Sequence, residues 1–168
     1  GLLNAAIEDP NPYLFFEHKA LYRSHKEKVF DDYYTTEVGK ARLVSKGDDL
    51  TIVTYGMGVY WAKDIMTEFD NVTADIIDLR TLQPWDKEAV SESVEKTNKV
   101  FIVHEDCITG GIGAEISAWI NENCFEFLDA PIMREGGLDT PIPFKKELEE
   151  NFMALSRMRD KIQKLINY

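Results

Sequence analysis

The chain has 168 residues, 44% of them hydrophobic, which is enough for one buried core and too few for two full-sized domains. Its 30 acidic residues outnumber the 19 basic ones, and the resulting formal net charge of -11 excludes nucleic acid as an expected partner. No apolar run approaches the roughly 18 residues of a membrane helix, so no membrane partner is expected either.

Cysteine usage indicates a reducing environment. Cys107 and Cys124 lack a C-x-x-C spacing, and we expect both to be free thiols. The sequence begins without the basic and apolar regions of a signal peptide. These features favour a cytoplasmic protein. The acidic surface would suit a basic protein partner, although many cytoplasmic proteins are acidic without having one.

The first forty residues are irregular in pattern. Residues 1–12 resemble the end of a helix that runs into a turn, because Pro10 and Pro12 have no amide donor to continue it. Since the first residue is Gly1 and not methionine, we expect residues 1–12 to end a preceding domain and residues 13–168 to form one domain. The run YLFF at 13–16 predicts a strand, and residues 17–40 predict an extended surface excursion.

Strands and helices alternate from residue 41 onward. We expect strands at 41–45, 50–55, 72–79, 99–104 and 130–135, and helices at 58–69, 86–96, 113–128 and 154–168. The runs TIVTY and VFIVH show little alternation, which is typical of strands covered on both faces. The sequence therefore predicts an α/β fold of three layers: an open, mostly parallel sheet with helices on both faces.

Glycine-rich turns follow two of these strands, where ligands of open α/β sheets gather. Gly56 and Gly58 would allow a tight turn at a helix start, but the spacing is not G-x-G-x-x-G because Trp61 takes the last position. We favour a structural turn over a phosphate site there.

The stretch HEDCITGGIGAE, residues 104–115, is the second glycine turn. Its glycines would expose amides to a phosphate, but three carboxylates share the stretch and no lysine or arginine lies near it in sequence. His104 and Cys107 make a poor nucleophilic pair, because those carboxylates disfavour a thiolate. The three histidines show no zinc spacing, and Glu17, His18 and Lys19 favour an ion-pair cluster.

The turn IEDPNP combines a helix-end carbonyl with Asp9 and Asn11. This all-oxygen set suits a hard cation. Asp and Asn also stabilise turns without any metal, so both interpretations stay open.

Six motifs in order connect the chain to a known family: NPYLFFEHKALYR, VTYGMGV, ADIIDLRTLQPWD, VHEDCITGGIGAEI, DAPIMREGGLDTPIP and the final KLINY. Over essentially its whole length the chain resembles the C-terminal domain of the beta subunit of thiamine-diphosphate-dependent 2-oxoacid dehydrogenases, the decarboxylating component. Pro84, Trp85 and Asp86, with the final INY, resemble the branched-chain type more than the pyruvate type.

The resemblance implies a transketolase C-terminal-like fold preceded, in residues 1–12, by the end of a pyrimidine-binding domain. The family oxidatively decarboxylates a 2-oxoacid on thiamine diphosphate and passes the acyl group to a lipoyl arm. Its cofactor and magnesium are bound by other domains, so this domain would be inactive alone and would hold no catalytic or cofactor-binding residue. Such a domain serves assembly and docking.

The resemblance also implies sites. Branched-chain members bind potassium at positions matching Asp9, Asn11 and the carbonyl of Ala6, where the family has a cysteine in place of alanine. Partners would be an alpha subunit or fused alpha region, a second beta subunit, and the basic subunit-binding domain of the lipoyl acyltransferase. The expected interface residues are His104, Glu105 and Asp106 toward another subunit, and Asp129 and Tyr168 toward the acyltransferase.

Other assignments stay open at this point. The same domain occurs in pyruvate dehydrogenase, in transketolase-like enzymes and in oxoacid-ferredoxin oxidoreductases. A free-standing module that binds a nucleotide or flavin through residues 56–58 or 110–113 is the alternative of another class.

Overall fold

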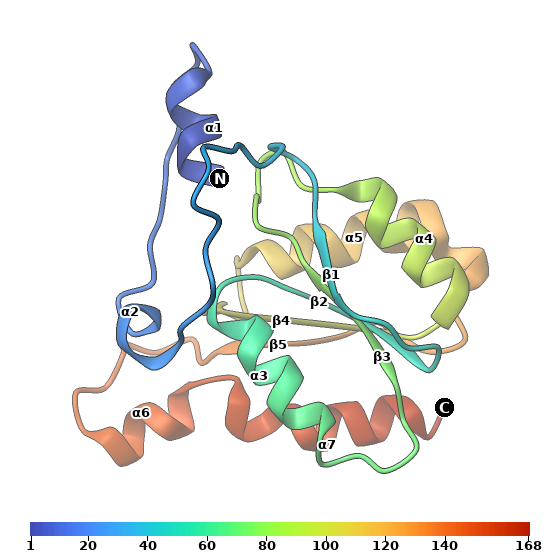
Figure 1. Cartoon of the computed structure of the whole chain (residues 1–168). Coiled ribbons are helices and arrows are strands. Elements are labelled where there is room, and N and C mark those ends of the chain that lie inside the picture. The colour runs from blue at the N-terminus through green and yellow to red at the C-terminus, as the bar shows by residue number, and fades with distance from the viewer.

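A five-stranded sheet in the order β1-β3-β2-β4-β5 forms the centre of the computed structural model, which describes residues 1–168 (Figure 1). The strands are β1 (Arg42–Ser45), β2 (Leu50–Thr54), β3 (Ala74–Asp78), β4 (Val100–Cys107) and β5 (Met133–Gly137). β2 is parallel to β3 and β4, and β4 is parallel to β5, whereas β1 runs antiparallel to β3. The predicted open, mostly parallel sheet is confirmed.

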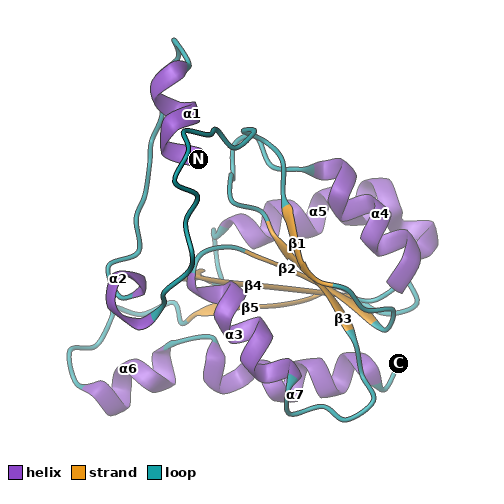
Figure 2. Ribbon diagram, viewed as in Figure 1, coloured by secondary structure: helices purple, strands orange, loops and turns teal.

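Helices cover both faces of this sheet, which gives the predicted three layers (Figure 2). The helices are α1 (Leu2–Glu8), α2 (Leu21–Ser24), α3 (Met57–Met66), α4 (Lys87–Thr97), α5 (Ile112–Cys124), a 3-10 turn η1 (Phe125–Phe127), α6 (Lys146–Phe152) and α7 (Leu155–Ile166). α3 and α7 pack on one face, and α4 and α5 pack on the other. None of the helices combines the length and apolar character needed to cross a bilayer.

The burial of the central strand, β2, explains why its sequence is almost continuously apolar. All five residues of β2 are buried. Ile52 belongs to the core beneath α3 and α7, and Val53 belongs to the core beneath α4 and α5. Because successive side chains of a strand point to opposite faces, a strand that is buried on both faces needs apolar residues at consecutive positions.

The strand boundaries differ from the prediction most at the end of β4 and at the start of β5. β4 continues to Cys107, with an irregular register against β5 between Val103 and Cys107. β5 begins at Met133 and not at residue 130. Pro131 has no amide to donate to the neighbouring strand, so pairing begins beyond it.

The first forty residues lie largely outside the layers (Figure 1). The predicted helix is present as α1 and ends before Pro10. The predicted strand at 13–16 is wrong for this structure: no backbone-to-backbone hydrogen bond involves residues 10–17. A strand needs a partner, and no other segment of the chain forms backbone hydrogen bonds with this one.

Candidate functional site

The end of β4 places His104 inside the molecule. Its side chain is 0% exposed. A Cβ on Gly113 would lie 2.5 Å from His104 Nε2, and one on Gly136 would lie 3.0 Å from His104 Cε1. Gly111 also faces the ring closely. These three glycines, from the start of α5 and from β5, leave the space that the imidazole fills.

The hydrogen bonding of His104 defines its protonation. Nδ1 donates to the carbonyl oxygen of Asp106 at 3.0 Å, and Nε2 is buried without a partner. Burial lowers the pKa of His104, because charging the ring would leave a cation without solvent. The ring is therefore a neutral packing element near neutral pH.

The expected interface role of His104 stays a prediction. In this structure its side chain is enclosed by β4, β5 and α5 and is not at the surface. Glu105 is half-buried and Asp106 is exposed, so both carboxylates remain at the surface. The pairing of His104 with Cys107 does not occur either, because the Cys107 thiol donates to the carbonyl oxygen of Leu138 at 3.6 Å.

A small polar cluster surrounds this strand end. His18 Nε2 lies 2.9 Å from Glu105 Oε1, so the N-terminal excursion is tied to the end of β4. Tyr55, which follows β2, stacks on His104 with ring centroids 6.4 Å apart. Burial, with the charges of Asp106 and Glu105, raises the pKa of Tyr55 to about 12. The cluster thus combines a neutral phenol and a neutral imidazole, and it lacks an activated nucleophile.

The glycine turns do not fit a diphosphate. Thr54 Oγ1 occupies the place that a Cβ on Gly58 would take, and His104 fills the space beside Gly111 and Gly113. Arg134 is far from the second turn in sequence but contacts it in the folded chain. Its Nη1 donates to the carbonyl oxygen of Ile108 at 3.2 Å. The glycines therefore serve close packing, and no cofactor step is derived through them.

The Asp9 turn is built as an Asx turn at the exposed end of α1. Asp9 Oδ1 accepts from the amide and the side-chain nitrogen of Asn11, at 2.8 and 2.7 Å. Asp9 Oδ2 accepts from the hydroxyl of Tyr13 at 3.0 Å. The hydrogen bonds from Asn11 lower the pKa of Asp9, which keeps the carboxylate charged.

The same turn leaves the carbonyl oxygen of Ala6 without a backbone hydrogen-bond donor. Pro10 has no amide to donate to Ala6, the residue four positions before it. Ala6, Asp9 and Asn11 thus present oxygens of the type that hard monovalent cations prefer. The structure contains no group of three or more histidine, cysteine or acidic side chains placed to hold a metal.

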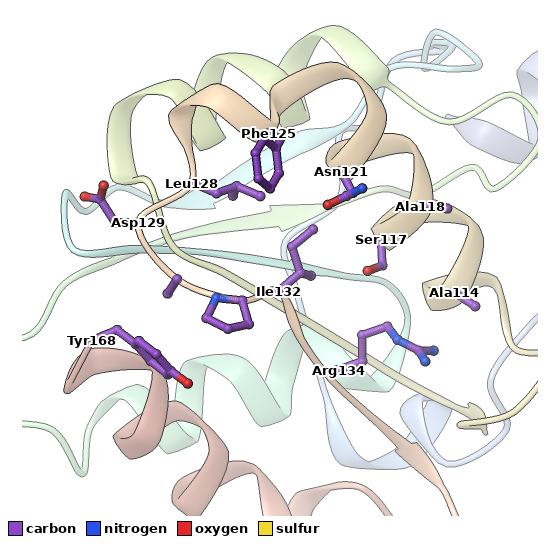
Figure 3. A pocket seen from close by; sticks show the side chains of 12 residues that line it. Ala114, Ser117, Ala118, Asn121, Phe125, Leu128, Asp129, Ile132, Arg134 and Tyr168 are labelled. Carbon is purple, nitrogen blue, oxygen red and sulfur yellow. The ribbon is translucent and has the colours of Figure 1, made fainter.

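A groove of about 730 Å³ lies between α5, β5 and the C-terminal end of the chain (Figure 3). Phe125, Leu128 and Ile132 supply apolar surface to it. Asp129 and Tyr168 lie at one end, and Arg134 lies at the opposite end. The structure thus brings together the two residues expected at a docking surface, and it adds Arg134 and the apolar lining.

The sequence did not show which residues from other elements lie close to the end of β4. Gly136 of β5 and His18 of the N-terminal excursion approach β4 only in the folded chain. The sequence also did not predict that Arg134 contacts the second glycine turn and lines the groove. The glycine pair in REGGLD was the available signal, since consecutive glycines within a strand indicate a close approach.

Comparisons with known proteins agree with this fold. Residues 39–156 match the family described as transketolase, C-terminal domain. The chain is 46% identical to 2-oxoisovalerate dehydrogenase subunit beta of Bacillus subtilis, over 92% of the chain and 48% of that protein. It is 43% identical to pyruvate dehydrogenase E1 component subunit beta of Gracilaria tenuistipitata, over 89% of the chain and 47% of that protein.

A solved structure shows the same likeness. A split gene transketolase, described as an inactive beta4 tetramer, superposes with a TM-score of 0.68 at 26% identity, over 86% of the chain and 47% of that chain. The chain spans about half the length of the curated relatives it matches. The predicted resemblance and fold are confirmed, and the chain belongs to the transketolase C-terminal domain family.

Proposed function

We propose that this chain is the assembly and partner-docking domain of a 2-oxoacid dehydrogenase decarboxylating component of the branched-chain, 2-oxoisovalerate type. The observation that carries the proposal is the 46% identity to a 2-oxoisovalerate dehydrogenase beta subunit along 92% of the chain. In this account residues 1–12 end a preceding pyrimidine-binding domain. The protein acts in the cytoplasm.

The whole enzyme would oxidatively decarboxylate a 2-oxoacid and transfer the acyl group to a lipoyl arm. Thiamine diphosphate, held with magnesium, supplies an electron sink for the carbanion that decarboxylation leaves. We assign both groups to other domains, because the glycine turns here are filled by His104 and Thr54. The residues of this domain position subunits and take no part in bond making.

Docking of the acyltransferase is assigned to the groove at Asp129 and Tyr168. Its apolar lining offers contact area, and its acidic end matches a basic partner. The formal net charge of -11 adds long-range attraction for the same partner. Glu105 and Asp106 are assigned to contacts with the alpha subunit, or a fused alpha region, or a second beta subunit.

The substrate type has a second candidate. A pyruvate dehydrogenase beta subunit is nearly as similar, at 43% identity. A lipoyl-dependent acyl transfer assay on the full-length enzyme separates the two candidates. We expect faster transfer from 2-oxoisovalerate than from pyruvate. A preference for pyruvate would refute the branched-chain assignment, and no transfer from any 2-oxoacid would refute the enzyme class.

We also propose that the Asp9 turn contributes to a potassium site in the full-length enzyme. The ionised carboxylate of Asp9, the side-chain oxygen of Asn11 and the free carbonyl of Ala6 support it. Thermal unfolding of the full-length protein in potassium and in sodium chloride at equal ionic strength is the test. We expect a higher melting temperature in potassium, and loss of that difference in Asp9→Ala. Identical curves in the two salts would overturn the proposal.

A further inference from the structure

The groove at Asp129 and Tyr168 carries opposite charges at its two ends. Arg134 is the only cationic side chain among the residues that line it, and Asp129 is the only acidic one. The two side chains lie at opposite ends, with apolar surface between them (Figure 3). A basic partner would fill the Asp129 end and would leave the charge at Arg134 unanswered.

The guanidinium of Arg134 has no anionic partner in the chain. Nη1 donates to the carbonyl oxygen of Ile108 at 3.2 Å, and the other N–H groups of this side chain make no hydrogen bond. Arg159 differs, because it pairs with Glu68 at 3.0 Å. In a chain with 30 acidic and 19 basic residues, a partly buried arginine that stays unpaired is available to an anion from outside the chain.

The anion that fits this end of the groove is a carboxylate. A guanidinium can donate two parallel hydrogen bonds to one carboxylate, and the contact with Ile108 leaves donors of Arg134 for that purpose. Ser117 of α5 lines the same groove and offers a hydroxyl donor. A phosphate, with about two negative charges near neutral pH, would need more than the one cation that this end supplies.

We propose that Arg134 binds a carboxylate of the docking partner, which must therefore present an acidic side chain together with its basic ones. This inference rests on the proposed function and adds a second contact to the same groove. Because the two ends have opposite charges, Arg134 also sets the direction in which the partner docks. A reversed partner would bring like charges together at both ends.

Substitutions of Arg134 in the full-length enzyme test the proposal, with the acyltransferase subunit-binding domain as the titrant. We expect Arg134→Gln to weaken binding by about fivefold, Arg134→Lys to weaken it less, and Arg134→Glu to weaken it more. Arg159→Gln is the matched control, because Arg159 is half exposed and lies outside the groove. This control should leave the affinity unchanged. Melting temperatures establish that each variant is folded, and if Arg134→Gln does not fold, Arg134→Lys carries the comparison.

A double-mutant cycle identifies the partner carboxylate. Each Asp and Glu of the subunit-binding domain is replaced in turn by Asn or Gln, and each variant is titrated onto the unsubstituted enzyme and onto Arg134→Gln. We expect one of these replacements to weaken binding to the unsubstituted enzyme and to have no further effect on Arg134→Gln.

The outcomes separate this inference from the proposed function. If Asp129→Asn weakens binding and Arg134→Gln does not, the carboxylate contact is refuted while docking at the groove stands. A loss of affinity in Arg134→Gln that couples to no carboxylate of the partner also refutes the contact. Absence of any binding to the unsubstituted enzyme refutes the docking function, and the contact with it.

Discussion

His104 shows how one residue can imitate a catalytic site. A histidine beside acidic residues and glycines, at the carboxyl end of a strand, has the composition of a site. Its role depends on burial, which arises from glycines of α5 and β5 that the sequence does not show to be adjacent. The sequence thus identified the region, but it could not show that the ring is enclosed. Asp129 and Tyr168 line one groove in the folded chain, and their docking role stays a prediction.

Gly113→Ala tests the enclosure of the ring. The added methyl would meet His104 Nε2 at 2.5 Å and Ile102 Cγ2 at 3.2 Å, so α5 or the ring must move. We expect a loss of about 2–3 kcal/mol in the free energy of unfolding, measured by urea denaturation, despite the helical preference of alanine.

Gly110→Ala is the matched control. Its Cβ would meet nothing within 4 Å, and only its φ of 79° opposes substitution, at about 1 kcal/mol. Equal losses in the two variants would show that His104 is not held as described.

The buried imidazole also predicts a pH dependence of stability. The pKa of His104 is lowered in the folded state, so the unfolded chain takes up its proton at higher pH than the folded chain does. Above the unfolded value of about 6.5 both forms are neutral, and below it the free energy of unfolding falls as pH falls. We expect a smaller decrease between pH 7.5 and 5.5 in His104→Gln than in the unsubstituted chain. An identical decrease would contradict the burial of a neutral ring.

At the scale of elements, apolar patterns predicted most of the fold. The helices α3, α4, α5 and α7 and the strands β2, β3 and β4 follow from their runs because each is covered by this chain itself. The elements that the sequence predicted wrongly or missed have local causes. Pro131 delays β5, and residues 13–16 have strand character without a partner in the chain. α6 has no clear apolar period, and the prediction omitted it.

One buried carboxylate ties α7 to β5. Glu135 side-chain oxygens lie 3.0 Å from Arg157 Nε and 2.8 Å from Lys161 Nζ, and the Glu135 side chain is 5% exposed. Arg157 and Lys161 are partly exposed, so loss of the buried carboxylate weakens a cluster whose cations still reach solvent. We expect Glu135→Gln to lower the free energy of unfolding by about 2 kcal/mol.

Glu68→Gln provides the control, because it removes the carboxylate partner of another residue of α7, Arg159. Glu68 pairs with Arg159 at 3.0 Å, but both side chains are about half exposed. An exposed pair contributes about 0–1 kcal/mol, so this variant should be nearly as stable as the unsubstituted chain. Similar losses from both substitutions in urea denaturation would show that burial of Glu135 does not anchor α7.

At the scale of the whole molecule, the chain combines a complete core with two unsatisfied surfaces. The core of each face is closed by its own helices. The apolar N-terminal excursion and the groove at Asp129 and Tyr168 remain open. A stable domain with open surfaces is suited to binding other proteins, and the proposed function assigns the acyltransferase to the groove.

The central claim is that this domain binds partners through the groove at Asp129 and Tyr168. Titration of the acyltransferase subunit-binding domain onto the full-length enzyme, at low and at physiological salt, tests it most directly. We predict saturable binding that weakens with salt, a loss of affinity of about fivefold in Asp129→Asn, and no change in Asp64→Asn on α3. Absence of binding, or binding insensitive both to salt and to Asp129→Asn, would contradict the account.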